Sequence, residues 1–153
     1  MRRVADALAA LTKAAVALAM GMMAAIISAE VFFRYVLNSS LYFSEELSRF
    51  CFIWAGFLGA SLALRDGGHI GVTVLVDRLP PAVQRRMLAV ARVLVLLLLL
   101  VVMVAGASVL PDQWAQQTPT LGFSVFWFYL AVPVGALLMA VQLVALSCSS
   151  RSR

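Results

Sequence analysis

VLVLLLLLVVMVA, residues 93–105, is an unbroken apolar run with no polar side chain on any helical face. A helix of this composition suits surroundings of lipid or of other apolar helices. With its apolar neighbours the run extends over residues 87–110. About 20 such residues are enough to cross ~30 Å of hydrocarbon as a helix. The segment therefore predicts a membrane anchor, and the protein is expected to be an integral membrane protein.

Three further apolar stretches surround this anchor, at residues 14–37, 47–64 and 123–146. The chain as a whole is 63% hydrophobic, with a mean hydropathy of +0.99. We therefore predict an all-α fold, a single membrane domain over residues 1–153 with four transmembrane helices. The longest non-spanning segment, residues 65–86, is much shorter than a soluble domain of about 50 residues or more. Any soluble domain that the function requires must then belong to a partner protein.

The distribution of basic residues predicts how the helices cross the membrane. Lys and Arg precede the first span, lie between the second and third spans, and end the chain, whereas residues 38–46 and 111–122 contain none. By the positive-inside rule, both termini and the middle connection are cytoplasmic and the two short loops face outward. The net charge of +5 thus reflects topology and contact with membrane lipids rather than nucleic-acid binding, because the basic residues are divided among separate segments.

The N-terminus allows a second interpretation, a cleaved signal peptide. Arg2 and Arg3 precede an Ala-rich apolar run, and Ala29 is small enough to stand at a cleavage site. However, the run exceeds the 7–15 residues typical of a signal core, and Ile27 stands where a small residue is preferred. We therefore expect the first span to be retained.

The middle connection predicts a short helical segment along the cytoplasmic interface. Gly67 and Gly68 end the second span, and residues 69–79 are mostly apolar but too short to cross the membrane. Pro80 and Pro81 then favour the start of a helix that continues into the third span.

Charged residues in the first hairpin lie where a bilayer should exclude them. Glu30 and Arg34 are four residues apart in the first span, as are Glu45 and Arg49 at the start of the second, with Glu46 beside them. This spacing places side chains on one helical face. If the hairpin turn centres near residue 40, Arg34 also matches Glu45 or Glu46 in depth, and Glu30 matches Arg49. A charge at mid-membrane costs about 2.5–3.5 kcal/mol on insertion scales, so pairing or water access is expected.

A strip of small residues continues from Arg49 along the second span, formed by Gly56, Gly59, Ala60 and Ala63. Small residues allow helix backbones to approach closely. This small-residue strip is therefore a predicted close-packing face. It is either the seam of the first hairpin or a contact with another polypeptide.

The last span begins with an aromatic group typical of a membrane interface. Trp127 and Tyr129 lie there, and Trp114 in the preceding loop extends the predicted outer belt. Pro133 with Gly135 predicts a kink. Gln142, a lone polar residue further along, is expected to bond a neighbour or reach the interface.

The sequence offers little for catalysis. One histidine, His69, does not provide bis-histidine haem ligation, and the two cysteines, Cys51 and Cys148, are predicted on opposite sides of the membrane. Phosphate-binding Gly motifs and Ser–His pairs at matching depth are absent from the sequence. We expect no catalytic residues, no metal and no cofactor, and hence a protein that is not an enzyme.

Several motifs resemble those of a known transporter family. They are EVFFRYVLN at residues 30–38, FSEELSR at 43–49, WAGFLGA at 54–60, GHI at 68–70, and LG at 121–122 followed by YLAVPVG at 129–135. Together they are similar to the small, Q-type membrane subunit of tripartite ATP-independent periplasmic (TRAP) transporters. The resemblance covers residues 30–146. Ser124 departs from it where we expect a proline, which affects only the outer loop.

The resemblance implies a non-catalytic subunit of a sodium-coupled secondary transporter in the bacterial inner membrane, a symporter that imports an organic anion such as a carboxylate. The implied partners are a large multi-span subunit, which carries the substrate and sodium sites and moves as an elevator, and a periplasmic substrate-binding protein. Our hypothesis is that this chain scaffolds the large subunit. Glu30, Arg34, Glu45, Glu46 and Arg49 would lock the hairpin and its partner interface, and the outer loops would touch the binding protein.

Two alternatives come from other classes. The first is a small four-helix, proton-coupled exporter acting as a homodimer, in which Glu30 exchanges protons for a cationic substrate. Arg34, one turn away, argues against this role because it favours the ionised form of the acid. The second is a structural subunit of another membrane complex.

Overall fold

The structure, a computed structural model, describes residues 2–65 and 80–150. This part of the chain is almost entirely helical, with α1 at Arg2–Val36, α2 at Ser44–Arg65, α4 at Pro81–Gln113, α5 at Phe126–Tyr129 and α6 at Ala131–Ser150. The only strand-like pairing among these residues is an isolated antiparallel bridge between Gln117 and Ser124. The predicted interfacial segment falls in residues 66–79, outside the described part of the chain.

The predicted four-helix membrane architecture is confirmed. Within the described residues, four helical segments are long and apolar enough to cross a membrane: Ala7–Val36, Ser44–Arg65, Arg86–Gln113 and Phe126–Ala145. The helix that carries the third span begins earlier, with Pro81 in its first turn, as the two prolines predicted. Which end faces the periplasm stays a prediction, and we call the end predicted to face outward the outer end.

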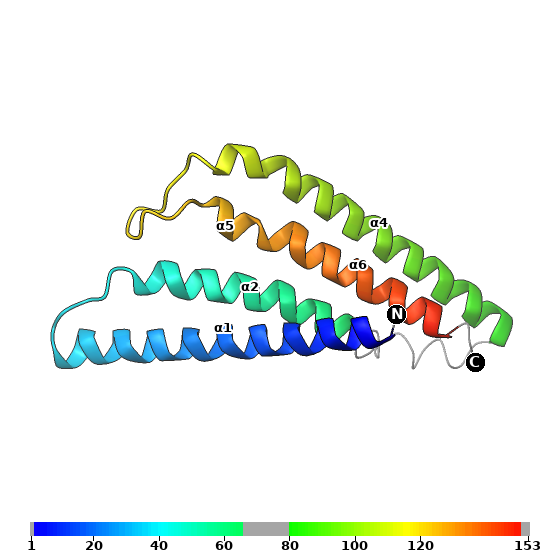
Figure 1. Cartoon of the computed structure of the whole chain (residues 1–153), viewed down its shortest axis with the longest axis horizontal. Helices are drawn as coiled ribbons and strands as arrows, with labels where there is room; N and C mark the ends of the chain where they lie inside the picture. The colour runs from blue at the N-terminus through cyan, green and yellow to red at the C-terminus, as the bar shows by residue number, and fades with distance from the viewer. Residues whose placement is uncertain (1, 66–79, 151–153) are drawn as a thin grey trace.

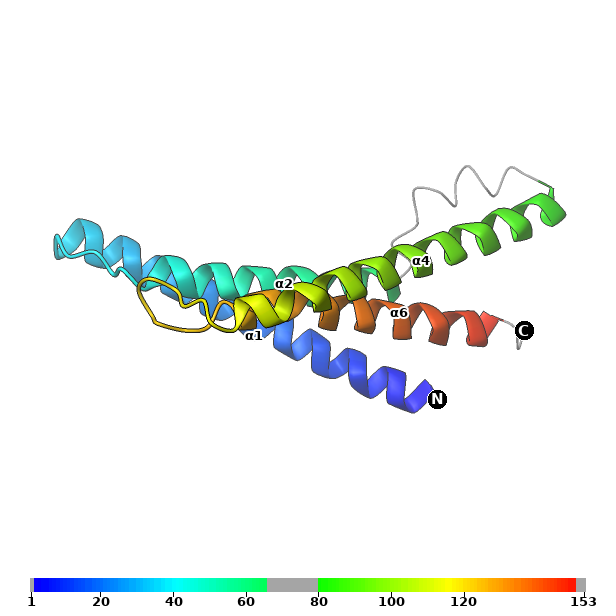
Figure 2. The same cartoon turned by 90° about the horizontal axis from the view of Figure 1, so that it is seen from above.

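Two helical hairpins make up the bundle (Figure 1). One hairpin is formed by α1 and α2, the other by α4 with α5 and α6, and they meet where α2 packs against α6. Figures 1 and 2 together show α2 and α6 in the middle of the bundle, with α1 and α4 on its two sides. The hairpins diverge toward the outer end, where the loop between α4 and α5 lies opposite the start of α2 (Figure 1).

A residue with left-handed backbone geometry follows the end of α1. Asn38 has φ = 48°, and the N–H of Ser39 donates to the carbonyl of Phe33 at 3.1 Å. Asn tolerates this conformation better than most residues with a Cβ atom, so it suits a helix end. The connecting segment then runs back along the bundle before α2 begins (Figure 1).

The predicted kink in the last span appears as an interruption between α5 and α6 at Leu130. Pro133 has no N–H to donate to the carbonyl of Tyr129, and its ring crowds that carbonyl, so a regular helix does not continue through this turn. Gly135 has a different role from the one expected, because it lets α6 approach α2. A Cβ atom at this position would lie 2.7 Å from the Cβ of Phe57.

A second glycine contact joins α4 to α6. A Cβ atom on Gly106 would lie 3.0 Å from Val132 Cγ1 and 3.2 Å from Pro133 Cδ. Both contacts fall close to the interruption at Leu130, and Ala131 and Ala136 are fully or almost fully buried there. The bundle is therefore held together around the beginning of α6, by small residues that bring three helices close to one another.

Gln142 departs from the expectation, because it neither bonds a neighbour nor reaches the interface. Its side chain is buried, with 3% of the residue exposed. Among the described residues, neither its Nε2 nor its Oε1 atom has a hydrogen-bond partner. The reason is its place on α6, which packs between α2 and α4. A buried amide without partners lowers stability.

We expect Gln142→Met to stabilise the fold by about 1–3 kcal/mol, because it removes the desolvation penalty of an unpaired amide while keeping an unbranched side chain. The measurement is the thermal unfolding midpoint of the detergent-solubilised protein. Gln116→Met is the control, since Gln116 is exposed and should leave the midpoint unchanged. A lower midpoint for Gln142→Met would mean that the amide makes a favourable contact in the folded protein.

Candidate functional site

The charged residues of the first hairpin form pairs within each helix. On α2, Arg49 Nη2 lies 2.6 Å from Glu45 Oε1, and on α1, Arg34 Nη1 lies 4.0 Å from Glu30 Oε1. Both are the i, i+4 pairs that the spacing predicts. The arginine side chains are 61% and 62% exposed, so they remain accessible to a partner or to lipid headgroups.

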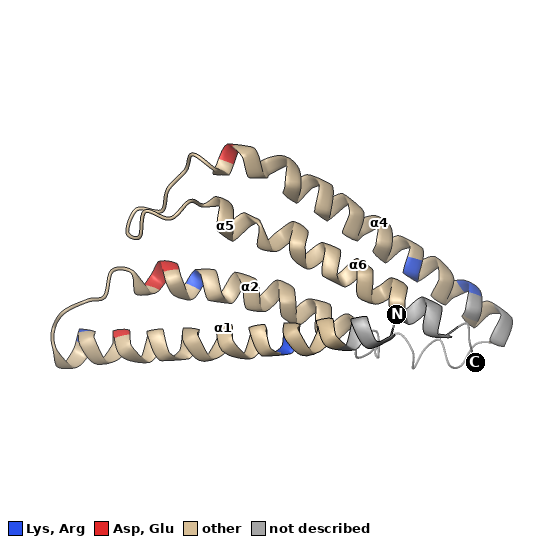
Figure 3. Cartoon of the chain, in the orientation of Figure 1, with Lys and Arg blue, Asp and Glu red and all other residues tan. Residues whose placement is uncertain are grey.

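The depth matching predicted between the two helices is wrong. Arg34 pairs with Glu30 and Arg49 pairs with Glu45, each within its own helix, while Glu46 bonds to Thr120 instead of Arg34. The physical reason is the connecting segment, which runs back along the bundle and shifts the start of α2 (Figure 3). Charged groups near the end of α1 and those at the start of α2 therefore lie at different levels.

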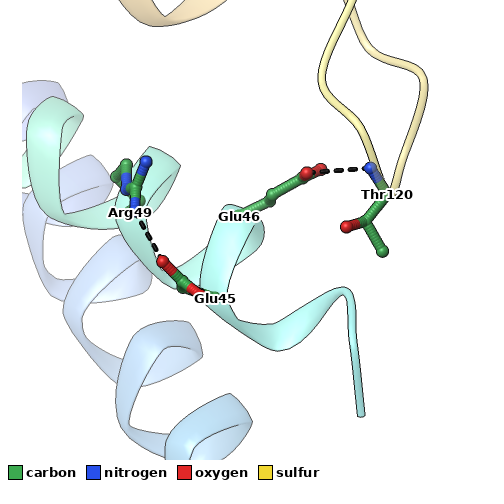
Figure 4. Close-up of polar contacts among 4 residues, drawn as sticks. All are labelled: Glu45, Glu46, Arg49 and Thr120. Atoms are coloured by element: carbon green, nitrogen blue, oxygen red, sulfur yellow. Dashed lines mark hydrogen bonds and ion pairs between the residues drawn. The ribbon is translucent and has the colours of Figure 1, made fainter.

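Glu46 points away from this pair, toward the loop between α4 and α5 (Figure 4). Its Oε1 atom accepts the backbone N–H of Thr120 at 2.9 Å, and its Oε2 atom accepts that of Leu121 at 3.0 Å. Both oxygens of one carboxylate are thus used on two consecutive amides. These bonds connect the first turn of α2 to a loop more than 70 residues away.

The receiving loop, residues 114–125, is folded on itself, and we call it the outer loop. Thr118 N–H donates to Phe123 O at 2.8 Å, and Val125 N–H donates to Gln116 O at 2.9 Å. Gly122 has φ = +65°, a conformation that glycine adopts without steric cost. The outer loop is therefore a tight hairpin-like turn rather than an extended linker.

Aromatic residues join the outer ends of the helices. The Nε1 atom of Trp54 donates to the carbonyl of Trp127 at 3.2 Å, close to the interruption where carbonyls need partners from outside the helix. The ring centroids of Phe50 and Phe128 are 5.3 Å apart, and those of Trp114 and Phe126 are 4.9 Å apart. Both contacts are edge-on, a favoured aromatic geometry.

The three residues predicted for the outer interface all lie at this end. Trp114 caps α4, and Trp127 and Tyr129 belong to α5. They are 63%, 49% and 43% exposed. Their role as a membrane-interface belt stays a prediction.

The small-residue strip is not packed within this chain. Gly56, Ala60 and Ala63 are exposed, and a Cβ atom added to Gly56 or Gly59 would meet none of the described atoms within 4 Å. The strip is therefore not the seam of the first hairpin. The remaining interpretation, contact with another polypeptide, stays a prediction. The close contacts inside the chain are those of Gly106 and Gly135, which the sequence analysis did not single out as packing sites.

A groove separates the two hairpins at the outer end. It has a volume of about 630 Å³. Glu45, Glu46 and Arg49 lie on its α2 side, Thr118 and Thr120 on its outer-loop side, and apolar residues further in, among them Ile53, Phe57 and Val132. Within the described part of the chain, groups of three or more His, Cys, Asp or Glu side chains that could hold a metal ion do not occur.

This architecture defines a small multi-span α-helical membrane protein with polar contacts between its two hairpins at the outer end. The chain belongs to the DctQ component family of the tripartite ATP-independent periplasmic transporters, whose family model matches residues 23–152. It is thus a small permease subunit of a TRAP transporter and a multi-pass protein of the bacterial inner membrane.

Individual relatives support this assignment to different extents. A TRAP transporter small permease protein of Haemophilus influenzae is 45% identical over 62 residues, which are 40% of this chain and only 38% of that protein. The ectoine TRAP transporter small permease protein TeaB of Halomonas elongata is 32% identical over 84% of this chain and 68% of its own length.

A third relative is much longer than this chain. The sialic acid TRAP transporter permease protein SiaT of Haemophilus influenzae is 28% identical over 78% of this chain, yet the matched region is only 19% of that protein. A region similar to this chain thus forms part of a much longer permease. Small subunits of this family work with large permease subunits.

Proposed function

We propose that this chain scaffolds the large subunit of a sodium-coupled, binding-protein-dependent importer, using the exposed face of α2. The observation that carries this proposal is the small-residue strip, which is open within the chain and continues from the exposed Glu45–Arg49 pair. In lipid, strips of this kind associate by close backbone approach, and neighbouring charges need partners or water. A helix of the large subunit satisfies both requirements.

The substrate class proposed is an organic anion such as a carboxylate. Two relatives are named for ectoine and for sialic acid, and both of these compounds contain a carboxylate group. The described part of this chain has no buried cluster of basic residues to bind such an anion. The substrate and sodium sites therefore belong to the large subunit in this proposal.

Docking of a periplasmic binding protein is assigned to the outer end. The outer loop is self-bonded and is tied to α2 by Glu46, so it presents a defined backbone surface. The exporter alternative receives no comparable support. Glu30 lies 4.0 Å from Arg34, so its carboxylate already has a cation as a neighbour on its own helix.

The test of the scaffold role is charge reversal at the exposed ion pair. Arg49→Glu places two acids one turn apart and removes the cation offered to the large subunit. We expect the amount of co-purified large subunit to fall about tenfold or more. A tenfold loss corresponds to a binding free energy weakened by about 1.4 kcal/mol. The measurement is the ratio of the two subunits after affinity purification from membranes.

A double variant separates partner contact from damage to the helix. Glu45→Arg with Arg49→Glu restores an ion pair of reversed direction. If Arg49 contacts the large subunit, this swap should leave assembly impaired, whereas a purely local defect should be repaired. Normal assembly together with normal substrate uptake in Arg49→Glu would contradict the proposal.

A further inference from the structure

Glu46 is bound differently from the four other charged residues at the outer end of the first hairpin. Glu30, Arg34, Glu45 and Arg49 each interact within their own helix, whereas Glu46 connects α2 to the outer loop. Figure 4 shows the side chains of Glu45 and Arg49 turned toward each other, and that of Glu46 directed at Thr120. Of these two neighbouring carboxylates, Glu45 thus pairs within α2 and Glu46 binds the outer loop.

Several backbone amides of the outer loop are bonded within the loop. Thr118 N–H bonds to Phe123 O, Val125 N–H bonds to Gln116 O, and Gly122 N–H bonds to Thr118 O. The amides of Thr120 and Leu121 instead have the Glu46 carboxylate as their acceptor. Hydrogen bonds to an ionised acceptor are shorter and stronger than neutral ones. The tip is therefore fixed by α2 and the base by the loop itself.

This contact joins the two hairpins at their outer end. The hairpins diverge toward the outer end (Figure 1), and the groove of about 630 Å³ lies between them there. Glu46 and Thr120 both line that groove, from opposite sides. The bonds between them hold the loop tip against α2 across its opening.

We propose that Glu46 is a positioning residue that clamps the tip of the outer loop onto α2 and so holds the surface that the periplasmic binding protein contacts. The clamp itself follows from the geometry of this chain. Its effect on docking rests on the function proposed above. The structural consequence and the transport consequence can therefore be tested separately.

Hydrogen exchange measures the clamp directly, on the complete complex of this chain with its large subunit. In Glu46→Ala, the amides of Thr120 and Leu121 should exchange about tenfold faster or more, because they lose a charged acceptor. Glu46→Gln should give an intermediate rate, since its amide offers one acceptor oxygen in place of two. The Val125 amide, bonded to Gln116 at the base, should keep its rate in all variants.

Glu45→Ala is the matched control for exchange, because it removes a neighbouring carboxylate that pairs with Arg49 on the same helix. It should leave the Thr120 and Leu121 rates unchanged. Equal exchange at these two amides in the unmodified protein and in Glu46→Ala would overturn the clamp. Equally faster exchange at Val125 would also overturn it, because the loop would then be unfolding as a whole.

Uptake into proteoliposomes, measured against the concentration of the binding protein, tests the consequence. Glu46→Ala should raise the half-saturating concentration of the binding protein about tenfold and leave the maximal rate unchanged. Asp112→Asn, which removes an exposed acid at the end of α4, is the control and should change neither value. Faster exchange with an unchanged half-saturating concentration would retain the clamp and reject loop docking. A lower maximal rate alone would reject the positioning role.

Discussion

Gly135→Leu is expected to separate α2 from α6 and to destabilise the bundle by about 3 kcal/mol. Even a Cβ atom at this position would lie 2.7 Å from Phe57 Cβ, and 3.0 and 3.1 Å from two atoms of its ring. The nearest of these atoms is bonded directly to the backbone, so the clash cannot be relieved by side-chain rotation alone. The helices themselves must move. The measurement is the free energy of unfolding in a denaturing-detergent titration.

The same substitution elsewhere in the bundle provides the control. Gly21 lies on α1, and a Cβ atom added there meets none of the described atoms within 4 Å. Gly21→Leu should therefore leave the unfolding free energy unchanged or slightly raise it, since leucine favours helix more than glycine does. Adding Phe57→Ala to Gly135→Leu should recover part of the loss, because the ring atoms disappear while the Cβ atom remains. Equal stability of the two leucine variants would contradict the assigned contact.

Gly56→Leu should leave the fold of the chain unchanged but impair its assembly with the large subunit, unlike Gly135→Leu, which should destabilise the fold itself. Gly56 is exposed, and a Cβ atom added to it would have open space around it within this chain. If a helix of the large subunit packs there, a leucine side chain holds the two backbones apart and removes the contacts of close approach. We expect about tenfold less co-purified large subunit, with an unchanged thermal midpoint of the isolated chain.

A size series makes this result specific. Gly56→Ala should reduce assembly only slightly, and Gly56→Leu strongly, because a close backbone contact is graded by side-chain volume. Normal assembly of the leucine variant would assign the strip to lipid. The proposed scaffold contact would then have to lie on another face.

Hydrophobicity was sufficient to predict the four spans, because crossing a bilayer requires long apolar helices whatever their packing. Prolines also predicted local structure correctly at the start of α4 and near the interruption before α6, because proline fixes φ and has no N–H to donate. The ion pairs Glu30–Arg34 and Glu45–Arg49 were also predictable from the sequence, because i, i+4 spacing in a helix is enough to bring two side chains together.

Contacts between helices were much less predictable. The predicted pairs between α1 and α2 assumed a compact turn between the two helices. The connecting segment instead runs back along the bundle, so the charged residues of the two helices lie at different levels (Figure 3). Gly56 and Gly135 are both small residues in apolar helices, yet only Gly135 packs within the chain. The bonds of Glu46 depend on how one hairpin lies against the other. Such relations arise from tertiary packing, which a pattern within one helix does not encode.

The chemistry of the Glu46 contact also bears on how this loop can evolve. Its two donors are main-chain amides, which every residue except proline provides, so the contact places little demand on the side chains at positions 120 and 121. Sequence at the loop tip is thus free to diverge while the anchoring remains the same. Under the docking role proposed above, the docking surface could therefore be remodelled one residue at a time while the loop stays attached to α2.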